Sequence, residues 1–293
     1  MSVLTEIEEA VAGAAERQGE AVVGVGTGWR VASGFVAAEG RVLTSTHRIG
    51  DGDVRLRFAD GAVATGAVAT TDRDLGLASV EVETRGIEPL AWSQTGLRPG
   101  AAVVALARPG ERGLRASLGF VSAVERRVRG ARGRPVAGAI EHSAALPRGS
   151  AGGPLLNAGG ELVAVNLLRI DGGLILALGG SIRDRIERLV GGESVEPRYL
   201  GVAVAPPRVA RRLQRALGLE ERSGVLVRAV ESGTPADRAG LARGDLIVAA
   251  AGTELGGVDA LHEAVAAAAD SLSLTIVRGD DQRELEVELG SER

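Results

Sequence analysis

Short apolar runs separated by glycine or Asp-Gly make up most of the chain from about residue 21 to residue 178. The runs are rich in β-branched residues, which is typical of strands that end in tight turns. We expect strands at residues 21–25, 30–37, 41–45, 53–58, 62–70, 75–82, 101–107, 114–124, 136–142, 162–168 and 173–178. Their near-regular spacing predicts an all-β barrel or sandwich pair. Apolar residues at helical spacing predict helices at 3–17 and 182–189.

The pattern changes after the glycine-rich segment 191–194, which is the best candidate for a linker. Beyond it, helical and strand-like patterns alternate. Strands are expected at 201–204, 224–230, 245–250, 271–277 and 284–289, and helices at 209–217, 236–239 and 258–268. We therefore predict an N-terminal helical segment at 1–19, a β domain at 20–191 and a small mixed α/β domain at 195–293.

Composition agrees with two folded domains and excludes several functions. The 293 residues carry a net charge of -4, and all 34 basic residues are arginine, so we expect no nucleic-acid partner. The absence of cysteine excludes disulfides and thiolate sites, and three histidines argue against a metal centre. No apolar run approaches the roughly 18 residues of a membrane span, and the first residues do not resemble a signal peptide. The chain as written is expected in the cytoplasm, or in the periplasm or outside the cell if a leader was removed.

Three separated strings carry the candidate chemistry. Leu-Thr-Ser-Thr-His ends at His47, Asp-Arg-Asp-Leu-Gly-Leu begins at Asp72, and Gly-Ser-Ala-Gly-Gly-Pro-Leu-Leu-Asn begins at Gly149. Taken singly, they fit a strand-end histidine, an aspartate that caps a turn and a glycine turn before a strand. Together and in this order they resemble the trypsin-like serine proteases, and more closely the HtrA (DegP-like) family. The resemblance covers nearly the whole chain from about residue 30.

The resemblance implies a mainly β chain, with a chymotrypsin-like double β-barrel followed by a small mixed α/β PDZ domain. It also implies acyl-enzyme chemistry without a cofactor or metal. A serine hydroxyl attacks a peptide carbonyl only when a neutral imidazole takes its proton, and a carboxylate on the far ring nitrogen fixes the tautomer. By resemblance, His47 is this base and Asp74 is the carboxylate, with Asp72 as its nearest rival.

The expected nucleophile is missing, because the family's serine stands immediately before Gly-Gly-Pro, where this chain has Ala151. Ser150 lies one place early, and a shift of one residue would aim its side chain elsewhere. Two interpretations stay open. Either a Ser→Ala change inactivates an HtrA-type endopeptidase of protein quality control that cleaves unfolded polypeptides, or the chain is a natural pseudoprotease that acts as a chaperone or PDZ adaptor. The resemblance places the oxyanion hole in the turn formed by Gly149, Ser150 and Ala151.

Substrate preference is expected to be apolar. Trypsin-like enzymes that prefer basic side chains keep a carboxylate six residues before the nucleophile, and this chain has Ala145 there. Leu167 and Leu168 are expected to form other walls of the specificity pocket. A small or medium apolar residue should therefore precede the bond that is cut.

A basic loop is expected after the strand that ends at Val124. It is either a solvated surface segment or, as in HtrA proteins, a sensor of bound ligand. Its members are Arg126, Arg127, Arg129, Arg132 and Arg134.

The C-terminal module resembles a PDZ domain of the HtrA type, through the string that begins at Tyr199 and the string Ala-Gly-Leu-Ala-Arg-Gly-Asp-Leu-Ile that ends at Ile247. PDZ domains bind a peptide C-terminus as an added strand. The resemblance implies that the binding residues are Tyr199, Leu200, Gly201, Val202, Leu261 and Val265. Alternatively, the groove is filled internally or serves in assembly. The implied partners are unfolded polypeptides and peptide C-termini, and the family's usual assembly is a homotrimer.

Overall fold

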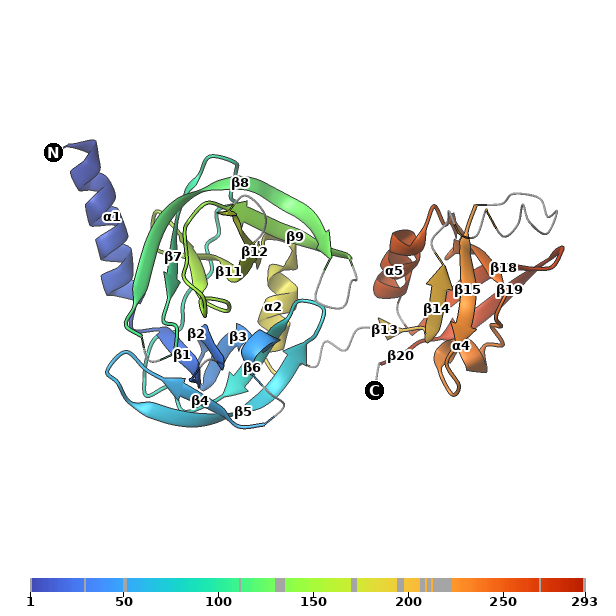
Figure 1. Cartoon of the computed structure of the whole chain (residues 1–293), viewed down its shortest axis with the longest axis horizontal. Helices are drawn as coiled ribbons and strands as arrows, with labels where there is room; N and C mark the ends of the chain where they lie inside the picture. Colours follow the sequence, from blue (N-terminus) through green and yellow to red (C-terminus); the bar gives the residue numbers. More distant parts are fainter. Residues whose placement is uncertain are drawn as a thin grey trace. The chain divides into compact units, whose positions relative to one another are not determined.

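The chain divides into two units, Met1–Val195 and Glu196–Arg293. The computed structural model describes all residues except 1, 29, 50–51, 111, 130–134, 170–172, 194–197, 206–208, 210–211, 213–222, 269 and 292–293. Unit 1 contains two closed β-barrels, and unit 2 contains a sheet with helices (Figure 1). The expected mainly β fold is confirmed. Among the described residues, none of the helices has both the length and the apolar composition needed to cross a lipid bilayer.

The first barrel is antiparallel, with the strands in the order β1-β2-β3-β6-β5-β4. Its strands are β1 (Val22–Thr27), β2 (Arg30–Ala38), β3 (Arg41–Ser45), β4 (Val54–Arg57), β5 (Val63–Asp72) and β6 (Leu77–Glu81). Phe35 pairs with Leu43 across β2 and β3, and both side chains are buried. Gly40, in the turn between these two strands, has a φ of 70°, which glycine adopts with little strain.

The second barrel is also antiparallel, in the order β10-β11-β12-β9-β8-β7. Its strands are β7 (Ala102–Ala107), β8 (Arg115–Arg129), β9 (Pro135–His142), β10 (Pro154–Asn157), β11 (Leu162–Arg169) and β12 (Ile175–Gly179). Two differences from expectation appear here. Strand β8 continues beyond Val124 to Arg129, because its arginines pair with β9 in a long hairpin. Strand β10 was not expected, because it is short and begins directly after a glycine turn.

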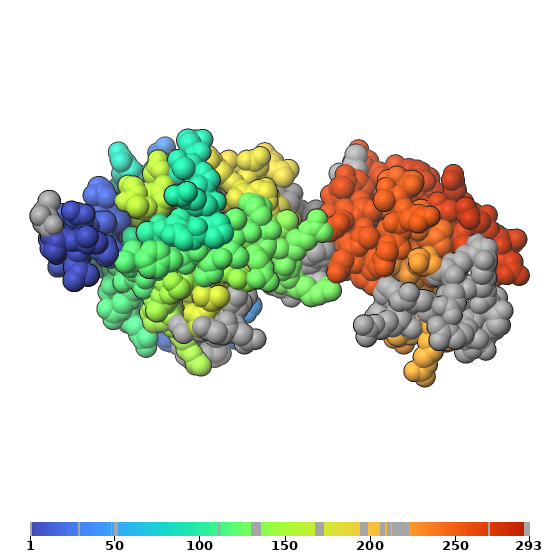
Figure 2. All heavy atoms as spheres, turned by 90° about the horizontal axis from the view of Figure 1, so that it is seen from above, coloured from blue at the N-terminus to red at the C-terminus, as the bar shows by residue number. Residues whose placement is uncertain are grey.

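Helices cover the outside of unit 1. They are α1 (Val3–Gln18), the single turns η1 (Thr46–Arg48) and η3 (Gly180–Ile182), and α2 (Arg183–Val190). Helix α1 lies against β7 and β8, and its first turns stand out from the surface in Figure 2. Val3 and Leu4 there are 70% and 78% exposed. Helix α2 lies against β3, β5 and β6 and buries Ile186, Leu189 and Val190.

The core of unit 1 is aliphatic. Valine, leucine, isoleucine and alanine from both barrels fill it, and Phe35 and Phe58 are its fully buried aromatic residues among those described. Close packing of these side chains holds the loops at the barrel ends, where the candidate site lies.

Unit 2 is a sheet in the order β14-β15-β16-β18-β19, with β17 paired to β16. Its elements are β13 (Arg198–Tyr199), β14 (Val202–Ala205), β15 (Val225–Val230), α4 (Pro235–Arg238), β16 (Leu246–Ala250), β17 (Thr253–Glu254), α5 (Val258–Ala267), β18 (Ser271–Arg278), β19 (Asp281–Glu288) and β20 (Gly290–Ser291). Strands β13 and β20 pair separately. Most of the helix expected at 209–217 lies outside the described residues.

Candidate active site

His47 lies in the single turn η1, directly after β3. Its backbone N–H donates to Ser45 Oγ at 3.3 Å, and the neighbouring Thr46 N–H donates to the carbonyl of Gly76 at 2.9 Å. The second bond joins the end of β3 to the turn between β5 and β6. The His47 side chain is exposed. Its imidazole accepts and donates no hydrogen bond within the part of the chain that the structure describes.

The turn between β5 and β6 carries both candidate aspartates. Asp72 is fully buried, and its Oδ1 accepts the backbone N–H groups of Asp74 at 3.1 Å and Leu75 at 3.0 Å. Arg185 of α2 reaches Asp72 with two nitrogens, Nε to Oδ2 at 2.5 Å and Nη2 to Oδ1 at 2.8 Å. Asp72 is therefore the residue that caps this turn, which was the structural role weighed for Asp74.

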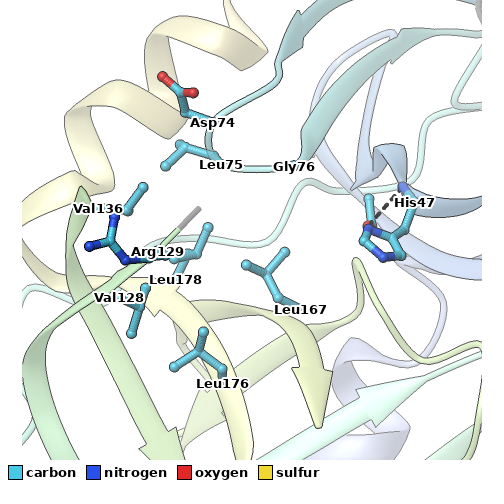
Figure 3. Close-up of a pocket in the computed structure, with 11 residues that line it drawn as sticks. His47, Asp74, Leu75, Gly76, Val128, Arg129, Val136, Leu167, Leu176 and Leu178 are labelled. Carbon is cyan, nitrogen blue, oxygen red and sulfur yellow. Dashed lines mark hydrogen bonds between the residues drawn. The ribbon is translucent and has the colours of Figure 1, made fainter. Parts of the chain in front are cut away.

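Asp74 is 5% exposed and lies beside the same arginine, with Oδ2 at 3.8 Å from Arg185 Nη2. Figure 3 shows its carboxylate directed toward α2, whereas His47 lies on the other side of the Leu75–Gly76 turn. Among the described residues, no hydrogen bond joins the His47 imidazole to the Asp74 carboxylate. The two side chains nevertheless line one cavity, of about 170 Å³.

This cavity is built by both barrels. Ser45, Leu75 and Gly76 come from the first barrel, and the second barrel supplies apolar walls and one arginine. The residues of the second barrel are Val128, Arg129, Val136, Leu167, Leu176 and Leu178. Charge interactions beside such apolar walls are stronger than in bulk water.

A second pocket, of about 700 Å³, brings His47 together with Gly149, Ser150 and Ala151. Its other walls are Val31, Leu146, Pro147, Arg148, Asn166, Leu167 and Ile175. His47 and Leu167 therefore line both spaces. The structure thus gathers two of the three expected catalytic positions, together with the expected oxyanion turn, around one pocket.

The three residues expected in the specificity pocket differ in their position in the structure. Leu167 lines the pocket, but Ala145 is exposed and does not line it. Leu146, which is buried, takes that place, because buried and exposed positions alternate along this segment. Ala144, Ala145 and Leu146 are all apolar, so the sequence alone carries no signal for which of them lines the pocket. The side chain of Leu168 lies outside the described part of the chain.

The turn that holds Ala151 is fixed by Ser33 of β2, which sequence reasoning missed. Ser33 Oγ donates to the Gly149 carbonyl at 3.0 Å and accepts the Arg108 N–H at 3.0 Å. The Ser33 N–H donates to the Ala151 carbonyl at 2.9 Å. Ser33 is fully buried, and a serine inside an apolar strand pattern gives no sign of this role.

Backbone geometry leaves donors available in this turn. Gly149 has a φ of 89° and Gly152 a φ of 88°. A Cβ on Gly152 would lie 2.3 Å from the Ser33 carbonyl oxygen, so glycine is required there. Within the described residues, the N–H groups of Gly149 and Ala151 have no hydrogen-bond acceptor, and the buried Ser150 Oγ has no partner. Two free N–H groups in one turn are the donors that an oxyanion requires.

His142 supports the same turn through a hydrogen bond to Asn166. Its Nε2 is 2.8 Å from Asn166 Oδ1, and its Nδ1 accepts the Ala144 N–H at 3.2 Å. Asn166 in turn donates to the carbonyls of Gly153 and Pro154. Burial lowers the pKa of His142, although its hydrogen bond to Asn166 opposes that shift. A neutral His142 with its proton on Nε2 satisfies both contacts.

In unit 2, residues 199–202 of the predicted peptide-binding set lead into the strand at the open edge of the sheet. Strand β14, which begins at Val202, is an edge strand, and the N–H groups of Leu200 and Gly201 have no acceptor among the described residues. Gly201 has a φ of 84°, and a Cβ there would collide with Thr234.

Three of the predicted peptide-binding residues make other contacts. The Tyr199 hydroxyl donates to Glu231. Leu261 and Val265 of α5 are buried in the core of the unit, so their side chains pack inward.

Comparisons with known proteins agree with this architecture. Residues 26–165 match the family model "Trypsin-like peptidase domain", and residues 199–289 match "PDZ domain". The "Putative serine protease HhoA" of Synechocystis sp. is 33% identical over 275 residues, which cover 87% of this chain and 69% of HhoA. The "Probable periplasmic serine endoprotease DegP-like" of Hahella chejuensis is 30% identical, and the alignment covers 88% of this chain but only 56% of that relative.

A solved structure has the same fold over nearly the full length. The structure "HtrA-type protease AlgW with decapeptide" superimposes with a TM-score of 0.79 at 21% sequence identity, covering 97% of this chain and 99% of that one. Both units therefore have counterparts, in the same order, in one protein.

Proposed function

This chain belongs to the HtrA/DegP family of trypsin-like serine proteases with a C-terminal PDZ domain, and on that basis we propose that its site between the barrels binds exposed polypeptide for acyl-enzyme hydrolysis. The observation that carries the proposal is the 700 Å³ pocket that His47 shares with Gly149 and Ala151. In this proposal His47 is the general base, Asp74 is its carboxylate partner and position 151 is the place of the nucleophile.

The mechanism follows from these positions once a serine stands at 151. The His47 imidazole takes the hydroxyl proton as Oγ attacks the peptide carbonyl carbon, and the N–H groups of Gly149 and residue 151 receive the resulting oxyanion. The imidazolium then gives its proton to the leaving amine, and water repeats the sequence on the acyl-enzyme. With Ala151 the first bond cannot form, and loss of such a nucleophile removes about six orders of magnitude in turnover.

The direct test is to restore the hydroxyl. We expect Ala151→Ser to hydrolyse a permanently unfolded protein and Ala151→Ser/Ser150→Ala to retain that activity, because Ser150 Oγ is buried beside the turn. Ala151→Ser/His47→Ala is the inactive control. Activity that disappears with Ser150 instead would move the nucleophile by one residue, and a folded but inactive Ala151→Ser protein would contradict the proposed chemistry.

The pocket walls support an apolar preference. Leu146, Leu167 and Ile175 line the pocket that contains Ala151, and none of the described lining residues is acidic. We propose that valine, alanine or leucine precedes the cleaved bond. A cleavage profile of the Ala151→Ser protein measured by mass spectrometry tests this, and a profile dominated by arginine or lysine would refute it.

A second candidate function is peptide binding without cleavage, favoured by Ala151 itself: the hydroxyl is absent while the two N–H donors and the pocket are present. The chain would then be a natural chaperone or adaptor rather than a Ser→Ala form of an endopeptidase. The codon for residue 151 in the encoding gene distinguishes the two origins. Suppression of the aggregation of an unfolded protein by the unaltered chain tests the chaperone activity.

We also propose peptide C-termini as ligands of unit 2, supported by the edge strand β14 and by the decapeptide in the AlgW structure. We propose a homotrimer because that is the usual assembly of the family, and the exposed apolar Val3 and Leu4 on α1 are a surface that assembly would cover. Light scattering measures its mass. The DegP-like relative is described as periplasmic, so we propose that this chain functions in the periplasm. Cell fractionation tests that location.

A further inference from the structure

Arg108 directly follows strand β7, and its side chain binds the main chain at the end of helix α1. Its Nε donates to the carbonyl of Val22 at 2.8 Å, and its Nη2 donates to the carbonyl of Gly19, the residue that ends α1, at 3.1 Å. In the part of the chain that the structure describes, Arg108 has no acidic partner. Burial lowers the pKa of this guanidinium, and carbonyl oxygens hold its charge. A cation at the C-terminal end of a helix is stabilising.

The backbone of Arg108 reaches the turn that holds residue 151. The Arg108 N–H donates to Ser33 Oγ at 3.0 Å, and the Ser33 hydroxyl donates to the Gly149 carbonyl at the same distance. The next residue, Pro109, is buried beside this turn, because a Cβ added to Gly149 would lie 3.1 Å from Pro109 Cβ. Arg108 therefore contacts the end of α1 through its side chain and the support of the turn through its N–H.

These contacts form a continuous series of hydrogen bonds from α1 to the turn. Both α1 and β1 lie against β7, and Arg108 is the first residue after β7 (Figure 1). A hydroxyl donates only one hydrogen, and the bond from the Arg108 N–H leaves that hydrogen of Ser33 for the Gly149 carbonyl. If Arg108 only stabilised the end of α1, its loss would leave the turn unaffected.

We propose that Arg108 is a positioning residue for the turn formed by Gly149, Ser150 and Ala151. Its guanidinium, bound to the end of α1 and the start of β1, holds the Arg108 N–H on Ser33 Oγ. Ser33 in turn holds the segment that carries the two free N–H donors. The position of α1 thereby contributes to the geometry in which those donors receive an oxyanion. The inference rests on the proposed function of this turn, but its first test needs no turnover.

The first test measures amide hydrogen exchange by NMR in the chain with Ala151. Gly152 and Gly153 directly follow the turn, and each N–H donates one backbone hydrogen bond, at 2.7 Å and 3.0 Å. Arg108→Met keeps an aliphatic side chain but removes both bonds to the carbonyls. We expect it to accelerate exchange at Gly152 and Gly153 about five- to tenfold, since local opening of the turn then breaks about one hydrogen bond fewer.

Arg183→Met is the matched control, because Arg183 also donates to a backbone carbonyl, that of Ser93, at 3.1 Å. The Ser93 N–H makes its own backbone hydrogen bond, at 2.8 Å. Arg183→Met should accelerate exchange at Ser93 and leave Gly152 and Gly153 unchanged, and Arg108→Met should do the reverse. Parental exchange of the turn in a folded Arg108→Met variant, or an equal acceleration at Ser93, would overturn the proposal.

Two further variants separate positioning from a general loss of stability. Arg108→Lys keeps the charge and a donor for the carbonyls, so it should return exchange of the turn to within about twofold of the parent. In a Ser33→Ala background, Arg108→Met should accelerate this exchange by less than about twofold, because the link is already broken. A lysine variant no better than the methionine variant, or a full effect of Arg108→Met without the Ser33 hydroxyl, would refute the proposal.

A milder variant keeps the proposal falsifiable if Arg108→Met does not fold. The shorter amide of Arg108→Gln can donate to one carbonyl at most, so exchange of the turn should still be about two- to threefold faster than in the parent. Parental exchange in a folded Arg108→Gln variant would refute the positioning role.

Kinetics connect the turn to the proposed reaction. In an Ala151→Ser background, Arg108→Met should lower kcat about five- to tenfold and change KM by less than about twofold, because displaced donors weaken the transition state more than the bound substrate. An unchanged kcat would overturn the positioning role. If the Ala151→Ser protein is inactive while the amides of the turn respond as expected, the proposed reaction fails and the positioning of the turn stands.

Discussion

Replacing Ser33 by alanine should damage both the stability of unit 1 and the turn that holds residue 151. The Ser33 hydroxyl is fully buried and makes two hydrogen bonds, one to the Gly149 carbonyl and one from the Arg108 N–H, both at 3.0 Å. Each bond contributes about 1 kcal/mol net, and a donor left without an acceptor costs about 1–3 kcal/mol. Ser33→Ala should therefore lower the free energy of unfolding by about 3 kcal/mol.

Thermal unfolding followed by circular dichroism measures this loss. For a unit of this size, about 3 kcal/mol corresponds to a fall in Tm of about 6–12 °C. Thr44→Val is the matched control, because Thr44 is equally buried on the neighbouring strand and donates a single bond, to the Ser33 carbonyl at 2.7 Å. It should cost about 1 kcal/mol. A loss below about 0.5 kcal/mol for Ser33→Ala, or one no larger than the control's, would refute the reasoning.

The same variant has a functional readout. In an Ala151→Ser background, Ser33→Ala should lower kcat by about tenfold or more and leave KM nearly unchanged, because a misplaced donor weakens the transition state more than the bound substrate. An equal effect on KM would assign Ser33 to substrate binding instead.

Three further predictions concern other buried contacts. Because burial lowers the pKa of His142, the unfolded state binds a proton more readily than the folded state does. The free energy of unfolding should therefore be highest above about pH 6.5 and should fall by up to about 1.4 kcal/mol per pH unit as the pH is lowered. Urea titrations at several pH values measure this slope, and His142→Gln should remove it. Gly152→Ala should destabilise unit 1 by about 3 kcal/mol or more, since its Cβ would meet the Ser33 carbonyl at 2.3 Å; a Tm equal to that of the parent would contradict this. Arg278→Met should lower the free energy of unfolding of unit 2 by about 3 kcal/mol at pH 7, because Asp245 is 1% exposed and loses its ion pair. The double variant Asp245→Asn/Arg278→Met should recover much of that loss in the same melting experiment.

The sign of the acid response in unit 2 follows from the same pair. Burial alone would raise the pKa of Asp245, but the hydrogen bonds from Arg278 and from the Ala242 N–H outweigh it and hold the pKa below its usual value. The pair therefore stabilises the fold above about pH 4 and loses its effect as the pH falls through the lowered pKa.

Local patterns predicted most of the strands, because short β-branched runs between glycines leave little choice of structure. The three short motifs that resemble the family identified His47, Asp74 and position 151 as candidates, since each motif consists of consecutive residues that can be recognised in the sequence. Long-range pairing could not be predicted in this way. Arg185 lies 113 residues from Asp72 and contacts it only in the folded chain, and Ser33 contacts a turn more than 100 residues away. Ala145 and Leu146 are both apolar, and counting along the chain does not say which of the two side chains faces the pocket.

The bonds of Ser33 also join the two barrels, since β2 belongs to the first barrel and the Gly149–Ala151 turn leads into the second. A nascent chain with only one barrel complete would lack the partner that shapes this turn. In the Ala151→Ser protein, the proposed hydrolytic activity would therefore appear only after both barrels have folded.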